Sequence, residues 1–150
     1  MSNITLFNKT FEPYLPESLI QEKIKELGEV ISKEYEGKRP LFIGVLNGSF
    51  MFAADLFKQI SIEAEICFIK LASYKGTGKT MNEFIPQLYH QQPASIKMAV
   101  LLHKPDATIY PVQIDYCCFS IPDRFVLGYG LDYDGFGRNL KEIYQLKESE

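Results

Sequence analysis

The spacing of hydrophobic positions changes along the chain, from a helical repeat near the N-terminus to short continuous runs farther on. Between Glu17 and Tyr35, apolar side chains recur every three or four residues, which predicts an amphipathic helix. Ser18 and Gln21 could form a capping box at its start, and Gly37 could end it. Residues 1–14 carry only scattered apolar side chains and are predicted to be irregular.

Short apolar runs alternate with helical patterns up to residue 104, which is typical of an α/β fold with a mainly parallel sheet. The predicted strands are Leu41–Leu46, Ile66–Tyr74 and Ile96–His103, and the predicted helices are Phe50–Ile60 and Thr80–His90. A β-rich C-terminal part follows, with runs at Tyr116–Ile121, Phe125–Tyr129 and Ile143–Leu146. Because no repeat or linker interrupts the chain, residues 1–150 are predicted to form one domain.

Composition narrows the classes of function. The chain has 150 residues, 46% hydrophobic and 23% charged, which is typical of a soluble globular protein. Its net charge of -3 argues against nucleic-acid binding as the main function, and no apolar stretch is long enough to cross a membrane. The three cysteines, all inside apolar runs, are expected to be buried free thiols in a reducing, cytoplasmic compartment. No zinc-ligand spacing is present.

The segment Gly76-Thr77-Gly78-Lys79-Thr80 is the most suggestive one for ligand binding. A glycine-rich turn between a strand and a helix presents backbone N–H groups at the positive end of the helix dipole, which suits a phosphate. A Walker A loop would need glycine where the chain has Ser73, so a nucleoside triphosphatase is disfavoured. An ordinary loop that starts a helix is the alternative.

Two other loops follow predicted strands. Leu46-Asn47-Gly48-Ser49 ends a buried run, and ligands of α/β sheets bind beyond the C-terminal ends of strands. The alternative is a simple turn with Ser49 as a helix N-cap. Lys104, after the third run, could donate to a carbonyl or a phosphate, but by itself it is better interpreted as a solvated lysine that opens a loop.

The segment from Phe119 to Leu140 combines acidic, basic and aromatic residues with glycine. Acidic side chains in such a turn suit Mg²⁺, which prefers oxygen ligands and often shares them with a substrate phosphate. An aromatic ring such as that of Phe125 could stack on a flat heterocycle. A β-meander with polar turns and core rings is the alternative.

Taken together, these segments resemble the bacterial hypoxanthine (hypoxanthine-guanine) phosphoribosyltransferases. The motifs fall in the family's order over nearly the whole chain: PLFIGVLNGSFMFAADL, IKLASYKGT, TGKTMNEFIPQL, ASIKMAVLLHKPDA and FSIPDRFVLGYGLDYDGFGRNLKEIYQL. The resemblance implies a type I phosphoribosyltransferase-like fold, with a twisted, mainly parallel sheet flanked by helices and a small β-rich C-terminal hood. It also implies Mg²⁺-dependent transfer of 5-phosphoribosyl from phosphoribosyl pyrophosphate to a 6-oxopurine, in a homo-oligomer that is a dimer or a tetramer.

The resemblance also assigns expected roles to single residues. Leu46, Asn47, Gly48 and Ser49 match the pyrophosphate loop, in which the Leu46–Asn47 peptide is expected to be cis. Ser73 and Tyr74 match the start of a mobile loop, and Thr77, Gly78, Lys79 and Thr80 match the 5-phosphate cradle. Lys104 matches the donor to the purine 6-oxo group, Phe125 the stacked ring and Val126 a backbone reader of the base. Asp132 matches the Mg²⁺ ligand, and Arg138 a pyrophosphate contact.

The chain departs from the family before Thr77. The family's Glu-Asp and later Asp, which hold the ribose and serve as acid/base, have no counterpart, so no catalytic residue is assigned. The missing stretch near residues 76–77 would hold roughly two to three dozen residues, judged from ordinary strand and loop lengths. Either the sequence omits a segment, which we favour because losing a central strand would be costly, or the deletion is real. A real deletion predicts an inactive nucleotide-binding or regulatory protein.

Overall fold

The computed structural model describes residues 2–71, 79–108 and 112–148, and for Lys79 and Thr80 it describes the backbone alone. Contacts within the chain divide it into two compact units. The first unit comprises Met1–Lys70 with Arg124–Glu150, and the second comprises Leu71–Asp123. The single domain that the sequence suggests therefore stays a prediction.

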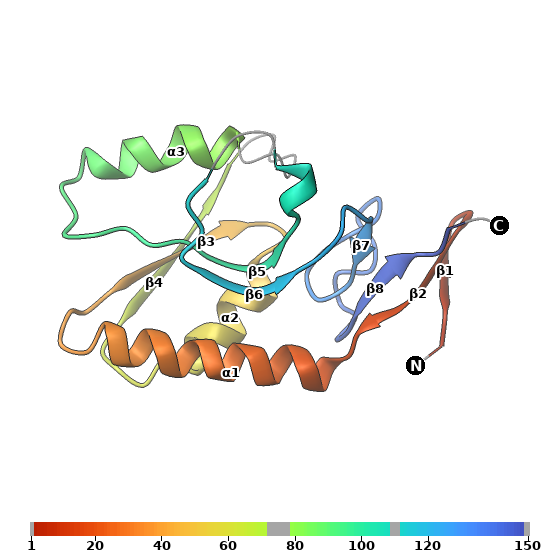
Figure 1. Cartoon of the computed structure of the whole chain (residues 1–150), viewed down its shortest axis with the longest axis horizontal. Helices are drawn as coiled ribbons and strands as arrows, with labels where there is room; N and C mark the ends of the chain where they lie inside the picture. The colour runs from red at the N-terminus through yellow and green to blue at the C-terminus, as the bar shows by residue number, and fades with distance from the viewer. Residues whose placement is uncertain (1, 72–78, 109–111, 149–150) are drawn as a thin grey trace. The chain divides into compact units, whose positions relative to one another are not determined.

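The first unit contains a four-stranded antiparallel sheet made from both ends of the chain (Figure 1), in the order β1-β2-β8-β7. Its strands are β1 (Ile4–Leu6), β2 (Lys9–Leu15), β8 (Ile143–Leu146) and β7 (Val126–Leu127). The prediction that residues 1–14 are irregular is wrong. The reason is that β2 gains its partner β8 from more than 120 residues away, and Pro13, beside a register shift, obscures the local strand pattern.

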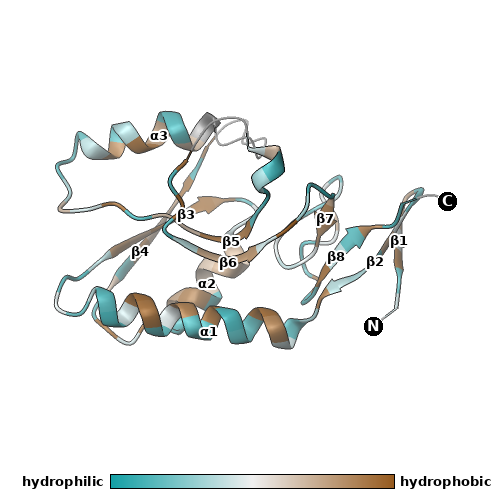
Figure 2. Cartoon of the chain, in the orientation of Figure 1, coloured by the Kyte–Doolittle hydropathy of each residue, from teal (hydrophilic) through white to brown (hydrophobic). Residues whose placement is uncertain are grey.

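Helix α1 (Glu17–Glu34) and helix α2 (Phe50–Lys58) pack together in the same unit. Figure 2 shows brown, apolar segments alternating with teal, polar segments along the ribbon of α1, which agrees with the predicted amphipathic pattern. Gly28 permits the close approach, because a Cβ there would lie 2.4 Å from Cβ of Gln59, just beyond α2. The predicted capping box is wrong: Pro16 is the N-cap residue, and no side chain caps the helix.

Two parallel strand pairs confirm the predicted α/β class. In the first unit, β3 (Leu41–Leu46) pairs with β4 (Glu65–Lys70) in continuous parallel register. In the second unit, β5 (Ala99–His103) pairs with β6 (Tyr116–Ser120), and helix α3 (Lys79–Tyr89) and a 3₁₀ turn (Pro105–Ala107) complete the described elements. Over the residues that the structure describes, these pairs remain two separate two-stranded ladders. The predicted hood, as a separate C-terminal element, stays a prediction, because β7 and β8 pair within the N-terminal sheet.

The hydrophobic core lies almost entirely in the first unit. Phe11, Ile20, Ile24, Leu127 and Ile143 are fully buried there, at 0% exposure. In the second unit, Ile121 is the one hydrophobic residue that is buried among those the structure describes. The strands β3 and β4 carry large exposed side chains, since Leu41 and Phe68 are 54% and 47% exposed. The parallel ladders are thus poorly covered compared with the antiparallel sheet.

The cysteines are free, as predicted, but their predicted burial is wrong. Cys67 and Cys117 are exposed, and Cys118 is half-buried. Both exposed cysteines lie on strands of the two-stranded ladders, whose faces are incompletely covered. No helix in the described ranges is both long and apolar enough to span a bilayer.

Candidate functional site

The loop Leu46–Ser49 joins the end of β3 to the start of α2. Its Leu46–Asn47 peptide is cis, as the resemblance implied. The backbone N–H of Phe50 donates to the Asn47 carbonyl at 3.1 Å, which closes a tight turn. Ser49 occupies the N-cap position, but its hydroxyl donates to the Val45 carbonyl and makes no cap hydrogen bond. The simpler reading of Ser49 as a helix-capping side chain is therefore wrong, and the first-turn amides of α2 are not covered by it.

A second loop, Gly128–Arg138, lies against this first loop. Gly130 has φ of +94°, and a Cβ at that position would lie only 2.6 Å from the Gly48 carbonyl oxygen. A Cβ on Gly48 would in turn meet the Leu131 side chain at 3.2 Å. Glycine is required at Gly130 both by the positive φ and by this backbone contact. The two loops that the sequence assigned to pyrophosphate and to Mg²⁺ thus touch one another in the first unit.

Asp132 and Arg138 form an ion pair inside the second loop. Arg138 Nη2 lies 3.2 Å from Asp132 Oδ1, and Arg138 Nη1 donates to the Gly130 carbonyl at 2.6 Å. The backbone N–H of Gly135 donates to Asp132 Oδ2 at 2.7 Å. Both side chains stay about one-third exposed, at 34% for Asp132 and 30% for Arg138. The loop therefore presents an ordered carboxylate and a guanidinium group to solvent.

This donor set fits a Mg²⁺ ion that is shared with a phosphate ligand. No group of three or more His, Cys, Asp or Glu side chains within the described residues could enclose a metal. Mg²⁺ commonly uses one or two carboxylates together with waters and substrate phosphate oxygens. The Asp132 carboxylate offers about four lone-pair positions and uses two of them within the protein. Asp132 could thus be one ligand of such an ion, and Arg138 could bind phosphate oxygens.

A partly buried polar network connects the second loop to helices α1 and α2, and the sequence did not reveal it. The Tyr129 hydroxyl donates to Asp55 Oδ2, and Gln21 Nε2 donates to the same oxygen at 3.0 Å. Lys58 Nζ lies 3.5 Å from Asp55 Oδ1. Burial raises the pKa of Asp55, but the hydrogen bonds from Tyr129 and Gln21 and the charge of Lys58 outweigh it, so the pKa lies below its ordinary value.

One sequence signal could have found this network. Tyr129 is an aromatic residue between two glycines, Gly128 and Gly130. Where such a ring is buried, its hydroxyl usually finds a hydrogen-bond partner. Its partner, Asp55, lies 74 residues away, so the pairing itself is not visible in the sequence.

The predicted base-contacting residues of the first unit lie on the sheet edge. The Phe125 ring is 44% exposed, and its other side is supported by Phe11 and Tyr133, with centroids at 6.1 and 5.7 Å. The hydrogen bond from Leu146 N–H to the Phe125 carbonyl, 2.8 Å, flanks the Val126–Gln145 pair. In that antiparallel pattern, the N–H and C=O of Val126 point away from β8, toward the edge of the sheet. An exposed ring thus lies beside an outward-facing backbone.

The other predicted residues belong to the second unit. Lys104 follows β5, is half-buried, and its carbonyl accepts from Ala107 N–H and Thr108 Oγ1, each at 3.1 Å. The backbone of Lys79 and Thr80 opens α3, close to the predicted start of that helix. Ser73, Tyr74, Thr77 and Gly78 lie outside the described residues. The predicted roles of these residues stay predictions.

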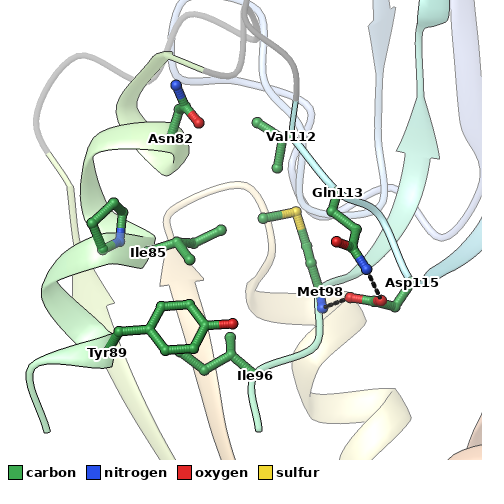
Figure 3. A pocket seen from close by; sticks show the side chains of 9 residues that line it. Asn82, Ile85, Tyr89, Ile96, Met98, Val112, Gln113 and Asp115 are labelled. Carbon is green, nitrogen blue, oxygen red and sulfur yellow. Dashed lines mark hydrogen bonds between the residues drawn. The ribbon is translucent and has the colours of Figure 1, made fainter. Parts of the chain in front are cut away.

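The second unit also has a surface cavity of about 240 Å³, which no predicted site residue lines. It opens between α3 and two segments near residues 96–98 and 112–115 (Figure 3). The Asp115 carboxylate at its edge accepts from Met98 N–H at 2.8 Å and from Gln113 Nε2 at 3.0 Å. Its remaining lining is mostly apolar, with Ile85, Tyr89 and Ile96. Both carboxylate oxygens of Asp115 are thus already bonded within the protein.

Comparison with known proteins gives consistent matches to one family. The chain is 35% identical to the hypoxanthine-guanine phosphoribosyltransferase of Streptococcus pneumoniae, covering 86% of this chain and 89% of that protein. It is 36% identical to the enzyme of the same name from Lactococcus lactis, covering 87% and 88%. No family model matches.

Solved structures agree with these sequence matches. A hypoxanthine phosphoribosyltransferase from Staphylococcus aureus superposes with a TM-score of 0.86 at 33% identity, covering 91% of both chains. The Trypanosoma cruzi protein, in complex with the product IMP, superposes with a TM-score of 0.84 at 31% identity, covering 90% of this chain and 93% of that one. The phosphoribosyltransferase-like fold is thereby confirmed.

The alignment with the Streptococcus pneumoniae protein is longer than the chain. It spans 160 positions, whereas 86% of 150 residues is only about 129. About 31 aligned positions of that relative therefore have no counterpart here. This excess has the size expected for the missing stretch that carries the family's Glu-Asp and later Asp.

Proposed function

We propose that this chain, which belongs to the hypoxanthine-guanine phosphoribosyltransferase family, serves purine salvage by transferring 5-phosphoribosyl from phosphoribosyl pyrophosphate to hypoxanthine or guanine. The products would be IMP or GMP and pyrophosphate. The observation that carries the proposal is the backbone contact between Gly48 and Gly130. It joins the two loops whose groups suit a pyrophosphate leaving group. We also propose that the protein acts in the cytoplasm as a dimer or a tetramer.

The first unit would bind the departing pyrophosphate. The α2 amides and the Leu46–Ser49 loop offer N–H groups, and Arg138 offers a guanidinium that matches phosphate oxygens. A bound Mg²⁺, with Asp132 as a protein ligand, would neutralise charge that develops on the leaving group. Since such a reaction builds positive charge on the ribose and negative charge on pyrophosphate, placing these groups in advance would lower the barrier.

The resemblance implies roles for further residues at the purine and at the sugar phosphate. The exposed face of the Phe125 ring could stack on the base, and the outward N–H and C=O of Val126 could read one of its edges. Lys104 would donate to the 6-oxo group, and Thr77 to Thr80 would hold the 5-phosphate. Ser73 and Tyr74 would begin a loop that closes over the reactants and keeps water from the activated sugar.

A second candidate is a nucleotide-binding or regulatory protein of the same fold that does not turn over substrate. The observation that favours it is the missing Glu-Asp and later Asp, together with some 31 unmatched positions in the alignment. Without a group that moves the purine proton, binding could persist while transfer fails. Lys104, Phe125, Asp132 and Arg138 would then serve affinity alone.

One experiment separates the two candidates. The intact mass of the purified protein is measured first, and the same sample is mixed with Mg²⁺, phosphoribosyl pyrophosphate and hypoxanthine. A mass above 17.2 kDa with IMP formation supports the salvage enzyme and an omitted segment. A mass of 17.2 kDa, no IMP and intact nucleotide binding favours the second candidate. Absence of IMP from a heavier chain that still binds nucleotide contradicts the transferase proposal.

A further inference from the structure

Tyr129 is placed where it could control the geometry of the second loop. It is 3% exposed, has φ of +49°, and its N–H donates to the Leu140 carbonyl at 2.8 Å. Its side chain points to α2, where the hydroxyl donates to Asp55 and lies 3.5 Å from the Met51 carbonyl. Met51 and Asp55 are four residues apart and therefore lie on one face of that helix.

Tyr129 is connected through its neighbour Gly130 to the groups proposed to bind the ligand, Arg138 and Asp132. The next residue, Gly130, contacts Gly48 of the first loop through its backbone. The Gly130 carbonyl also accepts from Arg138 Nη1, and Arg138 in turn pairs with Asp132. A short path of covalent and hydrogen bonds thus leads from Asp55 to the groups that suit magnesium pyrophosphate.

We propose that Asp55 and Tyr129 act as positioning residues that hold the Gly128–Arg138 loop in register with Leu46–Ser49 for magnesium pyrophosphate. This inference deepens the proposed function and rests on it. Helix α2 is linked to both loops. Leu46–Ser49 leads into its first turn, and Asp55, one turn farther on, accepts from Tyr129 of the second loop. One rigid element therefore fixes the first loop covalently and the second loop through the Tyr129 hydroxyl. Gln21 of α1, at 3.0 Å from Asp55 Oδ2 and 3.4 Å from the Tyr129 hydroxyl, braces the pair.

Three variants test the positioning role. Tyr129→Phe removes the hydroxyl and keeps the ring. Asp55→Ala removes the acceptor, whereas Asp55→Asn retains an oxygen that can accept from Tyr129. The matched control is Tyr144→Phe, which removes another buried tyrosine hydroxyl from the same unit, since Tyr144 is 6% exposed on β8 and is not linked to α2 by the contacts above.

The first readout is the affinity for magnesium pyrophosphate, measured by calorimetry. We expect it to fall roughly 3- to 10-fold in Tyr129→Phe and about 10-fold in Asp55→Ala, which is the scale of one lost hydrogen bond. Asp55→Asn should stay within about 2-fold of wild type, as should Tyr144→Phe. Equal affinity in all four variants, or an equal fall in Tyr144→Phe, would overturn the proposal.

The second readout does not depend on ligand binding. Backbone hydrogen exchange over residues 128–138 should speed up in Tyr129→Phe and Asp55→Ala but not in Tyr144→Phe. If wild type does not bind magnesium pyrophosphate, the proposed function fails at this site, and the exchange pattern alone decides the positioning role. Unchanged exchange in both Tyr129→Phe and Asp55→Ala would overturn that role.

Discussion

The two units of the chain differ in how well their structure supports the site. In the first unit, a four-stranded sheet and two helices bury a core that includes Phe11, Ile24 and Leu127. In the second unit, the described residues form one two-stranded ladder, a helix and a 3₁₀ turn, and bury only Ile121 among their hydrophobic side chains. The residues assigned to pyrophosphate and Mg²⁺ belong to the first unit, and those assigned to the 5-phosphate and the 6-oxo group belong to the second.

This difference follows from how completely each sheet is built in the described residues. Two-stranded sheets have marginal stability by themselves, because most of their backbone lies at an edge. Both parallel ladders are of this kind over the described residues, while the antiparallel sheet at the chain ends is complete enough to hide its apolar face. The parallel ladders are thus the less covered part of the described residues, and the Gly128–Arg138 loop, which follows β7 of the antiparallel sheet, keeps its contact with Gly48.

The largest expected effect tests this contrast in packing directly. Leu127→Ala should lower the free energy of unfolding by about 2–5 kcal/mol, because Leu127 is fully buried. Leu102→Ala, the same truncation on β5, should cost only about 1 kcal/mol, because Leu102 is half-buried. Urea unfolding of both variants measures the two losses. Equal losses would contradict the difference between the units.

The sequence predicted local elements better than their pairing. The ranges of α1, α2, α3 and β8 agree with the predicted ranges to within two residues at nearly every end, because each depends on a local hydrophobic pattern. The strand β2 was missed, since its stability comes from contacts with β8 at the other end of the chain. Burial of Cys67 was wrong for a related reason: an apolar run predicts a strand, but not whether anything covers its face.

For the site as well, the sequence predicted local segments but not the long-range contacts between them. The loops Leu46–Ser49 and Gly128–Arg138 were found from their residue types and from the resemblance, but their mutual contact at Gly48 and Gly130 was not. The pair of Asp55 and Tyr129 was missed altogether, because nothing local marks a helix aspartate as the partner of a distant tyrosine. Long-range hydrogen bonds are properties of the packed chain and leave little trace in a single sequence.

The next effect concerns the contact between the two loops. Gly130→Ala should destabilise the protein by roughly 2–3 kcal/mol, since a Cβ adds a clash with the Gly48 carbonyl to the strain of a positive φ. The control is Gly37→Ala, which also has positive φ, +77°, but has nothing within 4 Å, and should cost only about 1 kcal/mol. Unfolding and calorimetry with magnesium pyrophosphate measure both. Affinity retained by Gly130→Ala would show that the loop contact does not matter for binding.

A smaller effect tests whether Lys104 and Arg138, which belong to different units, bind different ligands. Lys104→Ala should weaken hypoxanthine binding about 10-fold, the scale of a charge-assisted hydrogen bond, and leave magnesium pyrophosphate affinity nearly unchanged. Arg138→Ala should do the reverse, because its guanidinium lies in the other unit, beside Asp132. Calorimetry with each ligand gives both affinities. Equal losses for both ligands in Lys104→Ala would remove Lys104 from the base pocket.

The smallest effect is the pH dependence that Asp55 gives to the first unit. Its lowered pKa means that the folded state binds the proton less tightly than the unfolded state does, so the stabilisation is fully present above the ordinary value of 3.8. It is then lost as the pH falls through the lower pKa of the folded protein. At pH 7, Asp55→Asn should be less stable than wild type by on the order of 1 kcal/mol, because it keeps an acceptor for Tyr129 but loses the charge that strengthens these hydrogen bonds and attracts Lys58. As the pH falls from 3.8 through that lower pKa, the two unfolding curves should converge; a constant gap would mean that the charge of Asp55 contributes nothing to how α2 holds Tyr129.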